Sequence, residues 1–477
     1  MRPAVAVLVA LTVGCAGLPA RHKPVQLADS APLEGLEAAS GGGWPAAEWW
    51  KRYQDPTLDQ LIALGGANSP SLATAHARYD SARQSVRLAA AESGARLDAT
   101  ADADRQRLSE NGLFPPQLLG FTWYNQFDLG LQASYTFDWW GKQRNAVEGA
   151  MDQAHAAQAD RSAAALMLAS SITDAYFGWQ SDQNRLVLLR EKEGAVESEA
   201  KVTAARVRAE LDSADALDSA DLTLAAAREQ IAALEGSAKL RIVALAALAG
   251  RSISELPPLV RRPLPAFPGV LPDNVKIDLI SRRADITASR WRVEAAEKSL
   301  ASARAEFFPD VTVNALLGLS SLDVGRLLEY GSRVPQISAA IHLPIFDAGR
   351  LKARYGGAQA AIDSAVSSYQ DTVISAARDV AMQATTLAQI DAQRLQRAKE
   401  VEAALRMRNT AAARVRQGLT DSRSELMATA SWIEQRDAMM QLDSAALSAD
   451  IALQRALGGG YESPQKLANS TSTTAAP

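Results

Sequence analysis

The stretch Tyr135-Thr-Phe-Asp-Trp-Trp-Gly-Lys-Gln-Arg144 occurs a second time, in altered form, as His342-Leu-Pro-Ile-Phe-Asp-Ala-Gly-Arg350. In each copy a short apolar run ends in Phe-Asp, a glycine and a base follow, and a long Ala-rich segment begins. An Asp at such a place is a good helix N-cap, because its carboxylate can accept the free N–H groups of the first turn. The pattern therefore predicts two strand-to-helix junctions, at Phe137-Asp138 and at Phe346-Asp347.

A second pair of matching segments shows that the chain is built twice. Asp138 and Asp347 lie 209 positions apart, and Ala205-Arg-Val-Arg208 recurs as Ala413-Arg-Val-Arg416 at an offset of 208. Two anchors with nearly the same offset make chance a poor explanation. Each half is therefore expected to run helix, strand, loop, strand, long helix, reversal, long helix.

The expected strands lie at about 96–106 and 126–138 in the first half and at about 310–320 and 335–346 in the second. Apolar and polar residues alternate along the first two, so that each has one apolar and one polar face. Such alternation is typical of barrel strands between lipid and an aqueous lumen. Two hairpins packed on a protein core are the alternative.

The helical segments are unusually long. No proline occurs between Pro116 and Pro257, so residues 142–208 can form one helix of about 100 Å, at about 1.5 Å per residue. We expect a reversal at 209–218 and a second helix that ends before Gly250. In the second half, a helix from about Ile280 to Phe307 precedes the strands. A coiled-coil seam then runs from Ile362 to Leu387.

The composition argues against several classes of function. The 477 residues include 50 basic and 54 acidic ones, so there is no basic excess to suggest nucleic acid binding. The single Cys permits neither an internal disulfide nor a Cys-based metal site, and the four His residues show no metal-ligand spacing. No combination of nucleophile and base stands out, so we expect no enzyme activity, no cofactor and no metal.

The N-terminus has the pattern of an export signal. One base precedes a short apolar run, and the lone Cys15 follows Gly14, as in a bacterial lipoprotein box. Cys15 is therefore the expected lipidation site, and ordinary cleavage after Ala16 is the alternative. No other segment is apolar enough for a membrane helix, so any further span must consist of strands.

The expected domain organisation follows. It comprises a signal peptide at 1–14, a lipid-anchored linker at 15–47, a first repeat at 48–255, a Pro-rich linker at 256–273, a second repeat at 274–460 and a disordered tail at 461–477.

Several short motifs, taken in order, resemble the TolC/OprM-type outer-membrane efflux proteins, in their NodT-like lipoprotein branch. These motifs are Trp49-Trp50, Asp55-Pro-Thr-Leu-Asp59, Asn68-Ser-Pro-Ser-Leu72, Phe137-Asp138 with Gly141, Arg282-Arg-Ala-Asp-Ile286, Phe307-Phe-Pro309 and Pro344-Ile-Phe-Asp-Ala-Gly-Arg350. They cover about residues 48–460. Ala284 stands where the family usually has Pro, and Trp139-Trp140 replaces a more usual Leu-Phe.

The resemblance implies a mainly α fold with a small transmembrane β-barrel portion. Three copies would form a 12-strand barrel that continues as a 12-helix tunnel. Four strands alone are too few to close a barrel, which independently favours pooling between copies. The implied function is a passive multidrug efflux channel in the outer membrane, extending into the periplasm. Its implied partners are the lipid bilayer, a periplasmic adaptor (membrane fusion) protein and an inner-membrane RND-type or similar transporter.

In this family the two helical reversals form the closed periplasmic end. The acidic residues there are our candidate gate: Glu210, Asp212, Asp215, Asp218, Asp421 and Glu425. The spacing of three places Asp212, Asp215 and Asp218 near one helical face, and three-fold symmetry would turn each into a ring. The family's acidic pore positions in the second repeat fall near Ser424 and Met427, neither of them acidic. Solvated helix ends rich in caps are the alternative.

A second function class remains open at this stage. The same helices suit a lipid-anchored periplasmic coiled-coil adaptor or scaffold protein, which would not need the two matched strand pairs.

Overall fold

The computed structural model describes Leu27, Ser30 and residues 40–111, 116–266, 271–272 and 275–462. The predicted signal peptide, Cys15 and residues 463–477 of the predicted disordered tail lie outside these residues. The elements that carry the argument are α2 (Pro56–Asn68), α3 (Pro70–Glu92), β2 (Arg96–Arg107), β3 (Trp123–Phe137), α5 (Lys142–Arg208), α6 (Ala214–Ala249), α7 (Val275–Arg282), α8 (Ala284–Ala305), β5 (Asp310–Ser321), β6 (Arg333–His342), α9 (Arg350–Arg416) and α10 (Ser422–Ala456). Short elements complete the list: β1 (Ser40–Gly42), η1 (Trp49–Tyr53), α4 (Pro116–Leu119), η2 (Ile253–Glu255), β4 (Leu271–Pro272), η3 (Val324–Arg326) and η4 (Tyr330–Ser332).

The chain divides into two compact units. Of the described residues, the strand unit contains 80–111, 116–156 and 290–368, and the helix unit contains 40–79, 157–266, 275–289 and 369–462. The long helices α5 and α9 contribute residues to both units.

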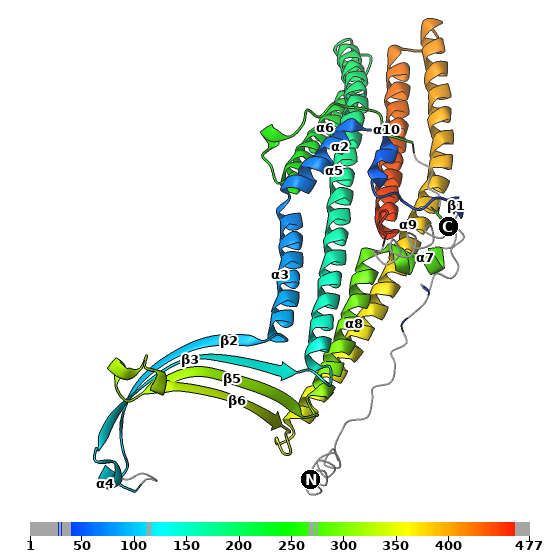
Figure 1. Ribbon diagram of the computed structural model, residues 1–477. Helices are drawn as coiled ribbons and strands as arrows, with labels where there is room; N and C mark the ends of the chain where they lie inside the picture. The colour runs from blue at the N-terminus through cyan, green and yellow to red at the C-terminus, as the bar shows by residue number, and fades with distance from the viewer. Residues whose placement is uncertain are drawn as a thin grey trace, which may run out of the picture. The chain divides into compact units, whose positions relative to one another are not determined.

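The strand unit contains one antiparallel sheet with the strand order β2-β3-β5-β6 (Figure 1). Its register pairs Ala99 with Leu131, Leu131 with Leu317 and Leu317 with Pro335. Because paired residues share a face and faces alternate along a strand, one face collects the apolar residues of all four strands. The opposite face carries Asp98, Asp102, Asp104 and Asp128 among other polar residues.

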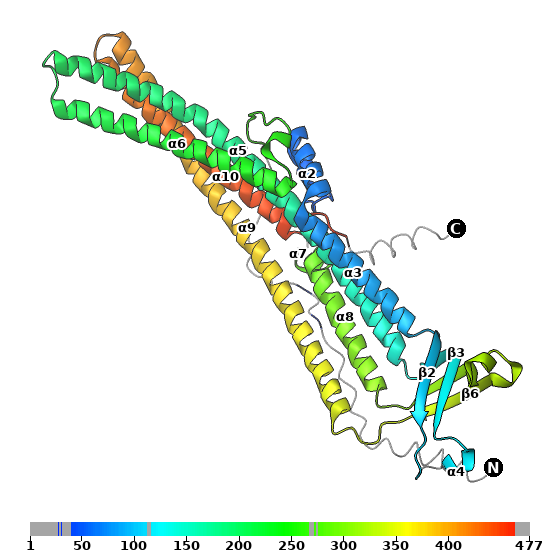
Figure 2. The same ribbon diagram turned by 90° about the vertical axis from the view of Figure 1, so that its left-hand side faces the viewer.

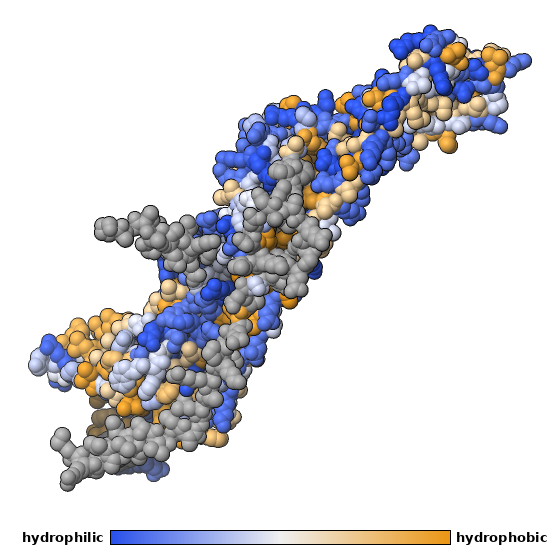
Figure 3. Space-filling model, turned by 90° about the vertical axis from the view of Figure 1, so that its right-hand side faces the viewer, coloured by the Kyte–Doolittle hydropathy of each residue, from blue (hydrophilic) through white to orange (hydrophobic). Residues whose placement is uncertain are grey.

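The apolar face of this sheet is largely uncovered by the described residues of the chain. Leu317 is 65% exposed and Ile337 is 79% exposed. Figure 3 shows hydrophobic residues gathered over the strands on the side in view. A wide exposed apolar surface marks a site of interaction with lipid or with another protein surface.

Two strand boundaries differ from the sequence prediction. β3 begins at Trp123 rather than near 126, because Trp123 pairs with Arg107. The last strand was predicted to reach 346, and this was wrong, since β6 ends at His342. Pro344 has no N–H for the ladder and restricts the backbone before it. Pro335 lies inside β6, which is an edge strand of the sheet within one chain.

Figure 2 shows the four long helices of the helix unit, and ion pairs join neighbouring helices in the order α6, α5, α10, α9. Arg190 pairs with Glu235 across α5 and α6, at 2.8 Å. Arg185 pairs with Asp437 across α5 and α10, also at 2.8 Å. Arg394 joins α9 to Asp443 of α10. Among the helices of the described residues, none combines the length and hydropathy needed to cross a bilayer.

The periodic seam predicted in α9 is confirmed in the helix unit. A continuous row of side chains is buried there: Tyr369, Val373, Ala377, Val380, Ala384 and Leu387. The ends of α10 and α6 contribute to a separate core with the N-terminal segment, which includes Trp49, Tyr53, Leu58, Leu245 and Ile451. Two buried hydroxyls fix that segment. Tyr53 donates to Asp450 at 2.8 Å, and Tyr176 donates to Asp55 at 2.7 Å.

The region before the second pair of strands also differs from expectation. A single helix was predicted to start near Ile280, whereas α7 begins at Val275 and a break at Arg283 separates it from α8. The Arg283 side chain bonds Asp285 and the carbonyl of Ala456, which holds the break in place.

The segment that follows η2 is held against α5 by two side-chain hydrogen bonds. Gln180 of α5 donates to the carbonyl of Val260, and Asn184 donates to that of Arg262.

Gly458 tests the packing of the residues after α10 against the end of α7. Its φ is +91°, and a Cβ there would lie 1.9 Å from the carbonyl oxygen of Arg282. We expect Gly458→Ala to lower the free energy of unfolding by about 3 kcal/mol or more, through strain and overpacking. Gly236→Ala in α6 is the matched control, because nothing lies within 4 Å of its added Cβ. It should raise stability by about 0.5–1 kcal/mol. Denaturant unfolding followed by helical circular dichroism measures both, and equal midpoints for the two variants would contradict this packing.

Candidate functional site

The two junction aspartates cap their helices. The carboxylate of Asp138 accepts from the backbone N–H of Arg144 at 2.7 Å. That of Asp347 accepts from Gly349 at 3.1 Å and from Leu351 at 2.9 Å. Each carboxylate thereby satisfies one N–H group that the first turn of a 67-residue helix leaves free.

The surroundings of the two junctions differ. Trp140 stacks on Phe308 with ring centroids 4.5 Å apart, and its Nε1 donates to the carbonyl of Pro309. Phe137 contacts the rings of Tyr135 and Trp139. Phe346, by contrast, is 89% exposed. These contacts position helices, and they bring together no set of groups for chemistry.

The reversals between the long helices have the same backbone in both repeats. Glu210 has φ 60° and Gly418 has φ 70°, so each turn uses one left-handed residue after the helix. The N–H of Leu211 donates to the carbonyl of Arg206, and that of Leu419 donates to Arg414. The turns close two hairpins, which we call the first hairpin (α5 and α6) and the second hairpin (α9 and α10).

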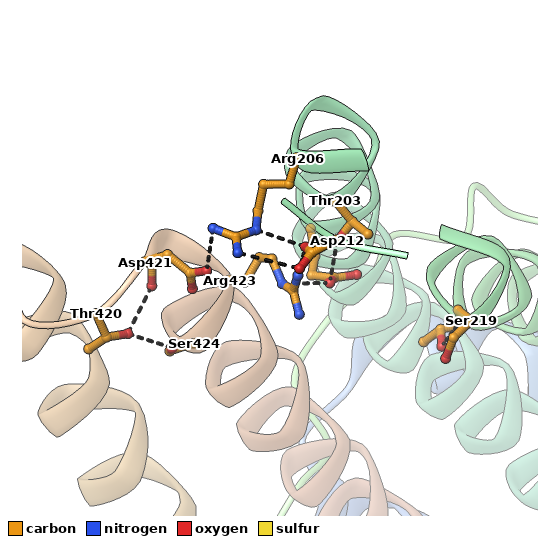
Figure 4. A network of polar contacts seen from close by, with 10 residues as sticks. Thr203, Arg206, Asp212, Ser219, Thr420, Asp421, Arg423 and Ser424 are labelled. Atoms are coloured by element: carbon orange, nitrogen blue, oxygen red, sulfur yellow. Dashed lines mark hydrogen bonds and ion pairs between the residues drawn. The ribbon is translucent and has the colours of Figure 1, made fainter. Parts of the chain in front are cut away.

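A polar network joins the two turns within one chain (Figure 4). We call Glu199, Arg206, Asp212, Asp421 and Arg423 the tip network. Asp212 accepts from Arg206 at 2.8 Å and from Arg423 at 2.5 Å. Arg206 also lies 3.5 Å from Asp421, and Arg423 lies 3.5 Å from Glu199. The first hairpin is therefore tied to the second by charge-assisted contacts.

The charge state of Asp212 follows from this geometry. Its hydrogen bond from Arg206, supported by the charges of Arg206 and Arg423, lowers its pKa. The same bond raises the pKa of Arg206. Asp212 is therefore ionised at neutral pH, and the positive charges of Arg206 and Arg423 balance its negative charge.

One part of the sequence prediction was wrong. Asp212 was expected on a helical face with Asp215 and Asp218, but α6 begins only at Ala214, so Asp212 belongs to the turn. The other candidate acids form a separate group. Within the part of the chain that the structure describes, no ion pair reaches Glu210, Asp215, Asp218 or Glu425.

Sequence reasoning missed three members of the tip network, Arg206, Arg423 and Glu199. Arg206 belongs to the repeated Ala-Arg-Val-Arg motif, which served only as a marker of the repeat. The spacing of Arg423 and Glu199 gave no sign that the two would meet, because that contact depends on how the hairpins pack. Over the described residues, no group of three or more His, Cys, Asp or Glu could hold a metal ion.

Comparison with known proteins decides the family. The model of the family described as "Outer membrane efflux protein" matches residues 61–251 and 277–459. The chain belongs to the outer membrane efflux protein family. It is 31% identical over 449 residues to the multidrug resistance outer membrane protein MdtP of Escherichia coli K12, covering 93% of this chain and 91% of that protein.

Solved structures agree with this assignment. The chain is similar to the outer membrane protein VceC of Vibrio cholerae, with a TM-score of 0.80, 32% identity and coverage of 88% of this chain and 100% of that one. It is also similar to the outer-membrane channel OprN, with a TM-score of 0.83, 26% identity and coverage of 94% and 99%. The predicted family, the mainly α fold with a few antiparallel strands and the efflux function are therefore confirmed. The family comprises efflux channels rather than enzymes, which favours a channel over the scaffold alternative.

The tip network should respond to acid. Because the pKa of Asp212 is depressed, its ion pairs are fully present above the ordinary Asp pKa of about 4 and are lost as pH falls through the lower folded value. Spin labels on Leu211→Cys and Leu419→Cys, in a Cys15→Ser background, report the distance between the turns. Their distance distribution should be narrow at neutral pH and broaden at low pH.

Asp212→Asn should already give the broad distribution at neutral pH. A distribution in Asp212→Asn at neutral pH that is as narrow as that of the wild type would rule out this role for Asp212.

Proposed function

We propose that this efflux protein acts as a homotrimeric, passive exit duct. The observation that carries the proposal is the open sheet β2-β3-β5-β6. Within the described residues, β2 and β6 each have one edge without a partner strand. Free N–H and C=O groups are costly in lipid, so a sheet that spans a membrane has to close on itself. Three copies supply twelve strands, and edge-to-edge pairing of β6 with the next β2 closes the barrel.

The two faces of the sheet suit this arrangement. The apolar face, with Leu317 and Ile337, would contact lipid, and the face with Asp102 and Asp128 would line the lumen. In the helix unit, α6 and α9 are the outer helices of the row of four. Contact of α9 with the next copy's α6 would give a twelve-helix tunnel in the periplasm.

The helical turns would form the gate of this duct. Asp212 and Asp421 are engaged by Arg206, so we assign cation binding to the acids without an ion pair, Glu210, Asp215, Asp218 and Glu425. Three-fold symmetry would convert each into a ring of like charges that repel one another and attract cations. A periplasmic adaptor and an inner-membrane RND-type or similar transporter would open the turns by binding there. Because relatives such as MdtP are named for multidrug resistance, we propose drugs as the cargo.

The N-terminus would add a lipid anchor. We propose that Cys15 carries the lipid, including palmitate, and holds the chain to the outer membrane in addition to the strands. The supporting observation is the short apolar run that precedes Gly14-Cys15.

Conductance across a planar bilayer tests the acidic gate. Asp218→Asn should raise the concentration of a divalent cation needed for half-block by about tenfold, equivalent to about 1.4 kcal/mol of binding energy. Glu229→Gln is the matched control, because Glu229 is also exposed on α6 but lies about 16 Å further along the helix. Equal block of wild type and Asp218→Asn would remove Asp218 from the gate.

Membrane fractionation tests the anchor and the membrane-spanning role separately. Cys15→Ala should abolish incorporation of labelled palmitate, while the protein stays in the outer-membrane fraction because the strands hold it there. Release of the Cys15→Ala protein from the membrane would instead favour the lipid-anchored scaffold. Palmitate labelling that survives in Cys15→Ala would contradict lipidation at this residue.

A further inference from the structure

The two outer helices of the row, α6 and α9, each have a neighbouring long helix on one side only among the described residues. α5 lies between α6 and α10, and α10 lies between α5 and α9, each joined by the ion pairs described above. Among the described residues, no ion pair reaches across from α6 to α9. In a closed ring, the outer helix α9 of one copy therefore meets the outer helix α6 of the next.

The repeat indicates how that contact is built, because the two hairpins correspond at a constant offset of 208. α5 and α9 both contain 67 residues, and their ends differ by 208 positions. The starts of α6 and α10 and the left-handed residues Glu210 and Gly418 differ by the same number. The contact of α5 with α10 inside one chain is thus a template for the contact of α9 with the next copy's α6.

Translating the tip network by this offset assigns each position a counterpart. Arg206 on α5 corresponds to Arg414 on α9, and Arg423 on α10 corresponds to Asp215 on α6. The acids of the network have neutral counterparts, which are Met407 for Glu199, Thr420 for Asp212 and Ser213 for Asp421. One basic position of the template has therefore become acidic, and three acidic positions have become neutral.

This exchange of charges is complementary. An arginine at position 215 would face Arg414 of the neighbouring copy with no acid to separate them. Asp215 instead offers a carboxylate to that guanidinium. Both residues are exposed, and neither has an ion pair in the described part of the chain.

We propose that Arg414 of one copy pairs with Asp215 of the next copy, so that the gate is completed only by the neighbouring chain. The proposal rests on the homotrimer proposed above. It moves Asp215 from the acids that face the pore to those that hold copies together, and it leaves Glu210, Asp218 and Glu425 as the cation-binding set.

In this arrangement, the contact between two hairpins of one chain is stronger than the contact between hairpins of neighbouring copies. Inside a chain, the hairpins are joined by two arginines and three acids. Between copies, they are joined by one exposed pair, which is weak and screened by salt. Opening then separates copies at the turns, while the two hairpins of each chain stay together.

Charge reversal tests the pair directly. Arg414→Asp and Asp215→Arg each place like charges together three times around the ring. Each single variant should therefore raise basal conductance in a planar bilayer by roughly threefold or more. The double variant restores opposite charges and should return conductance to the wild-type value. Arg416→Asp is the matched control, because Arg416 and its counterpart Arg208 are exposed and lie outside the tip network. It should leave conductance unchanged.

Crosslinking gives a readout that does not depend on conductance. In a Cys15→Ser background, Asp215→Cys with Arg414→Cys should give covalent dimers and trimers with a short bismaleimide, and Asp215→Cys with Arg416→Cys should give far fewer. Intact trimers on a native gel without crosslinks, or a double charge variant as leaky as the single ones, would overturn the pair and leave the duct standing. Absence of any oligomer in the wild type would contradict the proposed trimer itself.

Discussion

A four-stranded sheet with two open edges is the constraint on which the rest of this structure depends. Within the described residues its apolar face is largely uncovered, with Leu317 and Ile337 exposed, and β2 and β6 each have one edge without a partner strand. The apolar face suits contact with lipid, but the open edges do not, because an unpaired backbone group in lipid costs several kcal/mol. A chain that makes such a sheet has to meet copies of itself, and the same requirement extends to the uncovered sides of α6 and α9.

The two repeats of the chain use the same helix caps and the same turns. Asp138 and Asp347 cap helices of identical length, and Glu210 and Gly418 close identical turns. The differences between the repeats then carry the specific information. Trp140 is stacked on Phe308 while Phe346 is exposed, and Arg423 has an acidic counterpart in Asp215. In the proposed trimer, the positions at which the two halves diverge separate the contacts inside a chain from the contacts between chains.

Much of the fold follows from local pattern alone. Period-two alternation predicted the first pair of strands, and the repeated order of elements placed the second pair. The three-and-four spacing from Tyr369 to Leu387 identified a buried seam, because it depends only on which face of a helix is apolar. The ends of elements were harder to predict. β6 stops at His342 although the apolar pattern continues to Phe346, since the backbone restriction at Pro344 outweighs hydropathy. The break at Arg283 depends on a bond to Ala456, which lies far away in the sequence.

In the candidate site, too, local features could be predicted from the sequence and contacts that depend on packing could not. The acids of the turns could be named from sequence, because turns and charges are local. Which of them are neutralised could not be named, since Arg206 and Arg423 reach Asp212 only once the two hairpins are packed. The central claim is that the chain completes its sheet and its helix row only as three copies. Native mass spectrometry of the detergent-solubilised protein tests it most directly. The account predicts a dominant species with the mass of three chains, and a dominant single chain under conditions that preserve native helicity would contradict it.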